Sequence, residues 1–462
     1  MVALFSPHNF PNLNREILRL AVPNILSNLS VPLLSSYDTA LMGGLSGAHI
    51  AAVGLGSMAF NFVYWNFGFL RMSTTGMTAQ AYGRGATSEQ RTLLFRGGLL
   101  ALLISALLVV LQYPLGELTT WLLNIRPDQT SLVNDYFYLR IWAAPAALLQ
   151  MVLFGWFFGR QNALYPLLLT FLVNGANIAL STYLVTTLGW GITGVAWGTV
   201  GAQYFGLLIG IGLLLRENSR HGLQLFNGST DDEQQEKGSH SLTAFLSINR
   251  DIFLRTLCLT LSFAFFYNRA NALDVGTAVV AANVILLQLV NWLSYGVDGF
   301  AFAAESLVGK YYGAGQREQL RKVIRLIFVW GMALAGVYAL LYYSGDTWLL
   351  SLFAPESTAA STLEAAALYL PIVVAFCLLA TPCYLLDGIY IGLTAATAMR
   401  QTMLVAFAGY LLTYYLLGQH YGNWGLWGSL LLFMVLRAAL QSWWMASGRV
   451  LPAFTTSGSG GV

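Results

Sequence analysis

The chain is poor in charged residues. Asp, Glu, Lys and Arg make up only 9% of its 462 residues, whereas hydrophobic residues make up 56%. Because a soluble globular protein carries about 25% charged residues, this chain has too few to cover a water-exposed surface of its size. The net charge of +3 is too weak to indicate a nucleic-acid partner. The composition therefore favours a membrane protein over two or three soluble domains.

Cysteine and histidine are also scarce, and neither is spaced like a set of metal ligands. The cysteines lie in apolar runs without a disulfide framework, at Cys258, Cys377 and Cys383. The histidines fall in predicted loops or at helix ends, at His8, His49, His221, His240 and His420. We therefore predict no metal site and no cofactor, and a zinc enzyme is disfavoured.

What the chain does contain is long apolar segments. A helix needs about 20 apolar residues to cross the hydrocarbon of a bilayer, and the strand-like alternation of a β-barrel is missing. We predict an all-α polytopic membrane protein with twelve transmembrane helices. Their expected limits are 16–43, 50–82, 92–114, 134–158, 162–187, 191–215, 247–271, 276–311, 321–343, 364–391, 401–418 and 424–446.

The longest connection divides these helices six and six. Residues 216–246 are rich in Ser, Gly, Gln and acidic residues, which is typical of a solvated linker. We therefore predict an N-terminal six-helix bundle in residues 1–215, a cytoplasmic linker, a C-terminal six-helix bundle in residues 247–450 and a flexible tail in residues 451–462. Residues 1–15 are polar and do not resemble a secretory signal.

Lys and Arg are distributed unevenly about the predicted spans. The side opposite both termini receives only Arg126 and Arg269. Cytoplasmic loops carry an excess of Lys and Arg, so we expect both termini in the cytoplasm. The residues on the side of the termini are Arg15, Arg19, Arg84, Arg91, Arg96, Arg160, Arg216, Arg220, Lys237, Arg250, Lys310, Arg317, Arg321, Lys322, Arg325, Arg400 and Arg449.

The second half of the chain repeats the first at an offset of 230 residues. Tyr37-Asp38 falls on Tyr267-Asn268, and the YGRG segment at 82–85 falls on the YGAG segment at 312–315. Each half has an even number of spans, which predicts a pseudo-two-fold axis along the membrane normal and a cleft between the two bundles. Rocking the bundles would open the cleft to each side in turn, so transport is the leading function.

Asp38 lies deep in the first predicted helix, downstream of Pro23. An ionisable group inside a membrane span is costly and indicates function, and proline tends to kink a helix. A carboxylate on a kinked helix suits a proton-operated switch. The alternative is a permanently ionised cleft residue without a role in coupling.

Three further acids lie in predicted spans of the second half: Asp298, Glu305 and Asp387. Asp298 and Glu305 are seven residues apart and share a helix face. Pairing with a membrane arginine and a role in ion coupling both remain open for them. For Arg255, the simplest explanation is a local surface pair with Asp251, four residues before it.

Several segments together resemble the multidrug and toxic compound extrusion (MATE) family, in its DinF-like branch. The resemblance covers nearly the whole chain. Its segments are AVPNIL at 21–26 followed by Asp38, LRIWAAPA at 139–146, NGANIAL at 174–180, GWGITGVA at 189–196, LSINRD at 246–251, DGFAFAAE at 298–305 and LLDGIYIG at 385–392.

The resemblance implies cation-driven efflux of lipophilic, often cationic compounds, with Pro23 as a hinge and Asp38 as the proton-sensitive group. It implies a polar network in the N-terminal bundle, which maps onto Tyr37, Tyr136, Asn174, Asn177, Ser181 and Thr199. Ser181 stands where the family has a second acid, so Asp38 would act alone. Asp387 matches an acid of the sodium-coupled branch, but the seventh span offers only Asn268, so protons are favoured over Na⁺.

We therefore expect a proton-coupled multidrug antiporter, acting as a monomer in the bacterial inner membrane on lipophilic or cationic small molecules. A flippase of a lipid-linked precursor is the alternative, and it predicts a basic central cleft, against which the few scattered membrane arginines count. An intramembrane enzyme is less favoured, because no membrane His or Lys is available for a catalytic constellation.

Overall fold

The computed structural model describes residues 12–43, 47–122, 125, 127–222, 241–273, 276–345, 348–350 and 360–450. These residues form helices joined by short turns, with no strand among them. In chain order the helices are α1 (Leu13–Gly43), α2 (Gly47–Asn66), α3 (Phe69–Arg84), α4 (Thr87–Val110), α5 (Gln112–Leu122), α6 (Pro127–Arg140), η1 (Ile141–Ala143), α7 (Ala144–Gly159), α8 (Leu164–Thr182), η2 (Tyr183–Thr187), α9 (Gly191–His221), α11 (Leu242–Ala272), α12 (Thr277–Gly313), α13 (Arg317–Ser344), α15 (Ala360–Gly392), α16 (Ala396–Leu416), η4 (Gly418–Tyr421) and α17 (Gly422–Ala446).

The predicted all-helical membrane fold is confirmed. Each of the twelve predicted segments coincides with one helix or with consecutive helices, such as α2 and α3 for the second. Within the described residues, eight helices are long and apolar enough to cross a membrane by length and composition. α9 and α11 extend into both ends of the predicted linker, whose residues 223–240 lie outside the described part, as does the predicted tail at 451–462.

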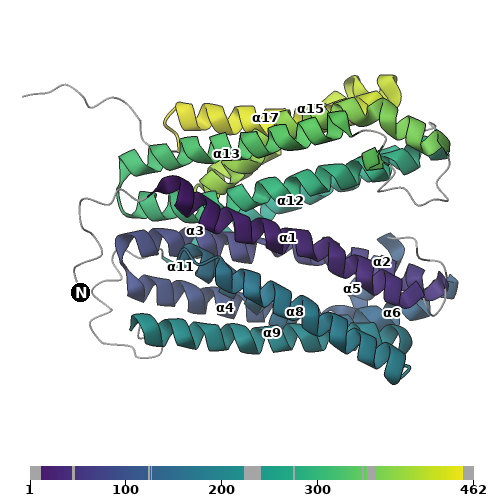
Figure 1. Ribbon diagram of the computed structural model, residues 1–462, viewed down its shortest axis with the longest axis horizontal. Coiled ribbons are helices and arrows are strands. Elements are labelled where there is room, and N and C mark those ends of the chain that lie inside the picture. Colours follow the sequence, from purple (N-terminus) through teal and green to yellow (C-terminus); the bar gives the residue numbers. More distant parts are fainter. Residues whose placement is uncertain are drawn as a thin grey trace, which may run out of the picture.

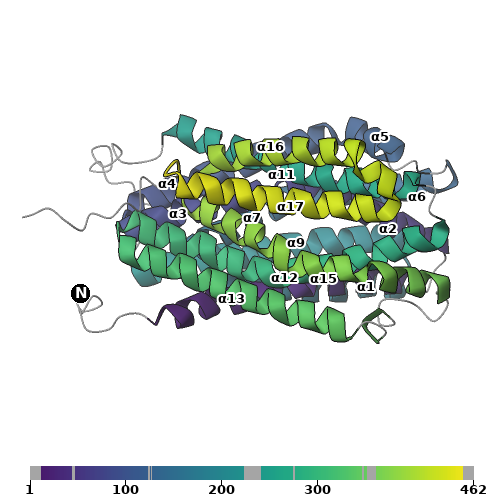
Figure 2. The same ribbon diagram turned by 90° about the horizontal axis from the view of Figure 1, so that it is seen from above.

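The helices form two lobes. In Figure 1 the helices from α1 to α9 make up one lobe, and α12, α13, α15 and α17 lie in the other. The turned view in Figure 2 shows that the helices run roughly along one axis. α1 packs against α8 of its own half and against α12 of the other half. It therefore lies where the two lobes meet.

The two halves touch through their backbones where α3 crosses α12. A Cβ atom at Gly83 would lie 2.0 Å from the carbonyl oxygen of Lys310, and one at Gly313 would lie 2.2 Å from that of Gln80. Gly313 follows Gly83, and Lys310 follows Gln80, by the same 230 residues found in the sequence repeat. The contact is therefore reciprocal, as a pseudo-two-fold axis requires.

Each half also has a close contact of its own at this end. A Cβ at Gly159 of α7 would meet Thr78 of α3, and one at Gly392 of α15 would meet the Glu305 carbonyl and Val308 of α12. Both sets of contacts lie near the ends of α3 and α12 that share an end of the molecule with the beginning of α1 (Figure 1). The lobes are thus closed against each other at that end.

We expect Gly83→Ala to destabilise the protein, because the added methyl group would overlap a backbone oxygen that cannot move freely. Overpacking of this kind costs about 1–3 kcal/mol. The free energy of unfolding, measured with a chemical denaturant in detergent, tests this. Gly336→Ala in α13 is the matched control, since a Cβ there meets no atom within 4 Å. Equal effects of the two variants would show that the crossing is not tight.

Candidate functional site

A cavity of about 220 Å³ lies between the two lobes. Arg71 of α3 reaches it from the first half, and Arg255 of α11 from the second. The three acids predicted as secondary candidates, Asp298, Glu305 and Asp387, all line it. Aromatic side chains complete much of the wall, including Trp65, Phe263, Phe302 and Tyr384.

Glu305 is held by an arginine from the other half of the chain. Nη1 of Arg71 donates to Oε2 of Glu305 at 2.9 Å, and Nη2 donates to Oε1 at 3.2 Å. The guanidinium carbon of Arg71 also lies 3.9 Å from the centre of the Phe302 ring, in a cation–π contact. This two-point ion pair joins α3 to α12, so it links the lobes as well as neutralising a buried acid.

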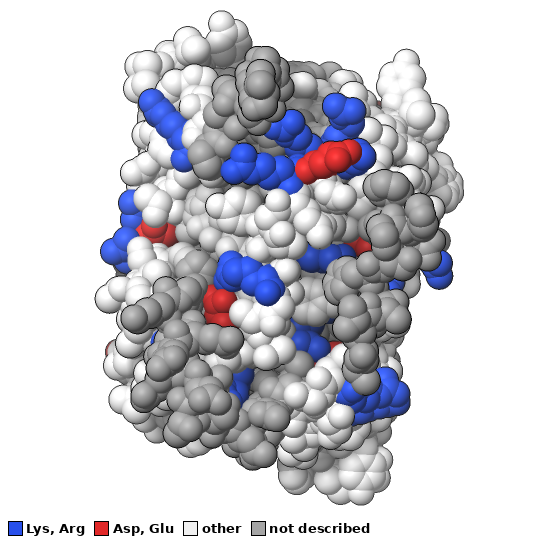
Figure 3. Space-filling model, turned by 90° about the vertical axis from the view of Figure 1, so that its left-hand side faces the viewer, with Lys and Arg blue, Asp and Glu red and all other residues white. Residues whose placement is uncertain are grey.

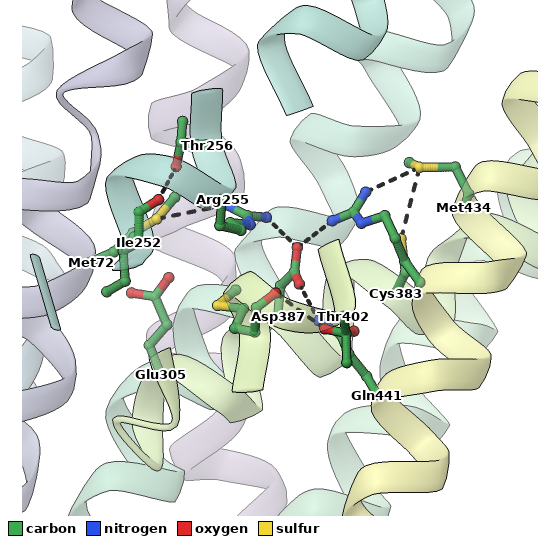
Figure 4. Close-up of polar contacts among 12 residues, drawn as sticks. Met72, Ile252, Arg255, Thr256, Glu305, Cys383, Asp387, Thr402, Met434 and Gln441 are labelled. Carbon is green, nitrogen blue, oxygen red and sulfur yellow. Dashed lines mark hydrogen bonds and ion pairs between the residues drawn. The ribbon is translucent and has the colours of Figure 1, made fainter. Parts of the chain in front are cut away.

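Asp387 is held by two arginines and an amide. Arg255 and Arg437 both donate to its Oδ2, the latter at 2.6 Å, and Nε2 of Gln441 donates to Oδ1 at 2.8 Å. Figure 4 shows Arg255 and Gln441 approaching Asp387 from different helices, with Glu305 on a separate segment. The Asp387 carboxylate is therefore fully compensated by groups of the protein itself.

The expected local pair between Asp251 and Arg255 is wrong. Asp251 Oδ1 instead accepts from Arg400 at 2.6 Å and from Arg250 at 3.0 Å, while Arg255 points to Asp387. The two residues are one helical turn apart, but Asp251 faces α16 and the Arg255 side chain lines the central cavity.

Asp298 differs from the other two acids of the cavity. It lines the cavity, and none of the hydrogen bonds and ion pairs found among the described residues reaches its carboxylate. It shares α12 with Glu305 but has no arginine partner of its own in this part of the chain. It is therefore the acid that the cavity leaves available to a ligand.

The polar network predicted in the N-terminal bundle is partly assembled. Nδ2 of Asn177 donates to Oγ1 of Thr199 at 3.0 Å, and Oγ of Ser181 donates to Oδ1 of Asn177 at 3.4 Å. All three side chains are buried between α8 and α9. Thr199 and Asn174 also line a separate cavity of about 370 Å³ inside the first half.

Ser181 is enclosed by a glycine of the neighbouring helix. A Cβ atom at Gly198 of α9 would lie only 2.2 Å from Ser181 Oγ and 2.8 Å from Ser181 Cα. The two small residues let α8 and α9 approach closely. A longer acidic side chain at position 181 would have no room on this side.

Two other predicted members of the network connect α8 to α1 instead. Nδ2 of Asn174 donates to Oγ of Ser30 at 3.0 Å, and the Tyr37 hydroxyl lies 2.6 Å from Oγ1 of Thr182. Ser30 and Thr182 were not predicted, because nothing in their spacing marks them. Asp38 belongs to α1, and its side chain lies outside the part that the structure describes.

Tyr136 lies in a different cluster, formed by α2 and α6. Its hydroxyl accepts from Nη1 of Arg140 at 2.5 Å and lies 3.1 Å from Oγ of Ser57. No contact joins it to Asn177 or Thr199 among the hydrogen bonds of the described residues. The structure thus separates Tyr136 from the rest of the predicted network.

Pro23 lies inside α1, which continues as a helix on both sides of it. Proline lacks the N–H that would bond to the carbonyl of Arg19, four residues before it. One residue later, Nδ2 of Asn24 donates to the Leu20 carbonyl at 2.7 Å. Side-chain bonds of this kind compete with the helix ladder and favour bending.

Known proteins resemble this chain over most of its length. The family model described as MatE matches residues 23–183 and 252–418. The chain is 34% identical over 425 residues to the DNA damage-inducible protein F of Escherichia coli (strain K12), covering 92% of this chain and 90% of that protein.

Solved structures share the fold at lower identity. A structure described as the outward-facing conformation of a multidrug resistance MATE family transporter aligns with a TM-score of 0.83 and 17% identity, covering 96% of this chain and 98% of that one. The bent form of the Vibrio cholerae MATE transporter VcmN aligns with a TM-score of 0.80 and 22% identity, covering 95% and 97%. At these identities the likeness establishes the fold alone.

We expect Asp387→Asn to lower the stability of the protein and Asp298→Asn to leave it close to that of the wild type. Asp387→Asn leaves two guanidinium groups facing each other without their shared carboxylate, and breaking such a buried pair costs about 3–5 kcal/mol. Asp298→Asn removes no ion pair of the described residues and is the matched control. Thermal unfolding of the purified variants in detergent measures both. An equal loss of stability would mean that Asp298 is also held by the protein.

Proposed function

We propose a function from the premise that the chain belongs to the MatE family. It is a transporter rather than an enzyme. It acts as a proton-coupled antiporter that exports lipophilic or cationic small molecules by alternating access, and the protonation of Asp38 is coupled to bending of the first helix.

The observation that carries this proposal is that α1 is hydrogen-bonded to both halves. Asn174 binds it to α8 through Ser30. On its other side, Nδ2 of Asn28 donates to the Tyr295 carbonyl of α12 at 3.2 Å, and Lys310 of α12 lies 3.1 Å from Glu16. A bend in α1 therefore changes contacts with both lobes, which is what an element coupling a local proton to a global motion must do.

The weak point for such a bend is built into the sequence of α1. Pro23 leaves the Arg19 carbonyl without its usual donor, and the side chains of Asn24, Ser30 and Ser36 bond to backbone carbonyls of the preceding turn. Each of these features weakens the regular ladder. Pro23 is therefore the proposed hinge and Asp38 the proposed proton acceptor.

Protons are preferred over Na⁺ as the coupling ion. A Na⁺ site needs oxygen ligands whose charge is not already neutralised. Asp387, the acid that resembles a sodium ligand of the family, is occupied by Arg255, Arg437 and Gln441. It has little left to offer a second cation.

The central cavity suits a lipophilic cation. Trp65, Phe263 and Tyr384 offer aromatic faces, and Asp298 offers a carboxylate without an arginine partner among the described residues. A flippase for a lipid pyrophosphate would need free basic groups there. Arg71 and Arg255 are instead both engaged by acids, which favours drug export.

We place the protein in the bacterial inner membrane as a monomer with both termini in the cytoplasm. Lys and Arg side chains are spread over the end of the molecule where α1 begins, with few acidic ones between them (Figure 3). This agrees with the excess of basic residues on cytoplasmic loops. The closed end of the molecule would then be the cytoplasmic one, and the structure would correspond to the outward-facing state.

Flux in proteoliposomes tests the proposal. The purified protein, reconstituted under an imposed pH gradient without Na⁺, is expected to transport a fluorescent lipophilic cation, and Asp38→Asn is expected to abolish this flux. Asp135→Asn, which changes an exposed acid, is the control and should transport normally.

Other outcomes of the flux experiment redirect the proposal. If the Asp38→Asn variant still transports the cation, Asp38 is not the coupling residue, and Asp298, Glu305 and Asp387 become the candidates. If flux appears only when Na⁺ is supplied, the proposal that protons are the coupling ion is wrong. If the wild type shows no flux with either ion, drug export is wrong and the flippase alternative is favoured.

A further inference from the structure

A third cavity, of about 400 Å³, lies at the end of the molecule where α1 begins. Its walls come from both halves: α1, α3, the turn between α7 and α8, α9, and α12. Four basic side chains line it, Arg19, Arg160, Arg220 and Lys310, and we refer to it as the basic pocket. It lies beside the α3–α12 crossing, since Lys310 takes part in both.

The basic pocket has more positive than negative charge. Its two acids are already engaged, Glu16 by Lys310 at 3.1 Å and Glu217 by Arg160 at 3.3 Å. Arg19 and Arg220 are exposed, and neither has a carboxylate partner among the described residues. Two positive charges are therefore left to attract an anion.

Arg160 provides a buried donor in the wall of the pocket. It is 8% exposed, and its Nη1 donates to Gln90 at 2.6 Å, but its Nε has no partner within the described part of the chain. Its guanidinium therefore brings positive charge to the wall of the pocket, although Glu217 is its ion-pair partner.

The adjacent residue holds the pocket in a strained geometry. Gln161 has φ of 65°, a left-handed conformation that side chains other than glycine adopt at a cost. Its Nε2 donates to the Ser306 carbonyl of α12 at 2.9 Å, which ties the turn between α7 and α8 to the other half.

We propose that the basic pocket binds an anionic phosphate group, through Arg19, Arg160 and Arg220. The guanidinium fork matches the phosphate oxygens and stays charged at any physiological pH. The phosphodiester of an acidic lipid headgroup and a free phosphate ester share this chemistry. Basic pockets between transmembrane helices on the cytoplasmic side bind such headgroups.

Binding would stabilise one conformation of the transporter. The three arginines belong to the first half, whereas Leu307 and Lys310 of the second half complete the wall, so the pocket is enclosed only while the lobes are closed at this end. A ligand that prefers one state shifts the equilibrium by its difference in affinity. This step rests on the proposed alternating access, whereas the binding site itself does not.

Titration of the full chain in a neutral detergent tests the site. Short-chain phosphatidylglycerol is expected to raise the midpoint of thermal unfolding of the wild type. The double variant R19Q/R220Q is expected to bind about 30-fold more weakly, at about 1 kcal/mol per basic residue near the headgroup. The control R317Q/R325Q removes two exposed arginines of the same end outside the pocket and should bind like the wild type.

Three probes separate the possible sources of the phosphate. If glycerol 3-phosphate and phosphatidylglycerol act equally, the ligand is a free phosphate ester. If only phosphatidylglycerol acts, while phosphatidylcholine and glycerol 3-phosphate do not, it is a lipid headgroup. The proposal is overturned if no phosphate compound raises the midpoint, or if R317Q/R325Q weakens binding as much as R19Q/R220Q does.

The effect on conformation is measured separately. Spin labels on Thr87→Cys and Gln316→Cys, exposed positions at this end of the two halves, report the distance between the lobes. The ligand is expected to shift this distance towards its shorter population in the wild type but not in R19Q/R220Q. An unchanged distribution with binding intact would overturn the conformational role. Since neither readout requires transport, failure of the flux experiment would leave the site itself unaffected.

Discussion

The way in which the two lobes fit together depends on the backbone contact between α3 and α12. Gly83 and Gly313 each lie against a carbonyl oxygen of the opposite helix, so the register of the two helices is fixed without side chains between them. Arg71 lies twelve residues before Gly83 and Glu305 eight before Gly313, about 18 Å and 12 Å along their helices. The crossing thereby sets the depth at which the ion pair between the lobes forms, and it closes the end beneath the central cavity.

The acids within the membrane divide by how completely the protein compensates them. Leaving a charge unpaired in a low-dielectric interior is costly, and two arginines bind Asp387 while one binds Glu305 through both oxygens. These pairs hold helices from distant parts of the chain together. Asp298 lacks such a partner among the described residues and faces the cavity. The acids that look equivalent in the sequence therefore differ in whether an arginine of the described residues pairs with them.

The helices were predictable from the sequence, and the partners of the acids were not. A membrane-spanning helix can be recognised from its local sequence alone, because it needs about 20 apolar residues. The repeat at an offset of 230 residues is consistent with the symmetric crossing at Gly83 and Gly313. The pair of Asp387 with Arg255 joins residues 132 positions apart, and its formation depends on how α11, α15 and α17 pack. Proximity in sequence pointed to Asp251 as the partner of Arg255, which the packing of α16 rules out. Asn177, Ser181 and Thr199, identified through the resemblance, are hydrogen-bonded to one another, whereas Tyr136 bonds to Arg140 and Ser57.

Ser181, which stands where the family has a second acid, lies in a tightly packed contact between α8 and α9. The sequence shows only that an acid is missing from this position. In the structure, a Cβ atom at Gly198 would lie 2.2 Å from Ser181 Oγ, so α8 and α9 approach closely here and a longer side chain directed at Gly198 would not fit. In the same half, α1 contains Pro23 and is the helix bonded to both lobes, to α8 through Ser30 and to α12 through Asn28.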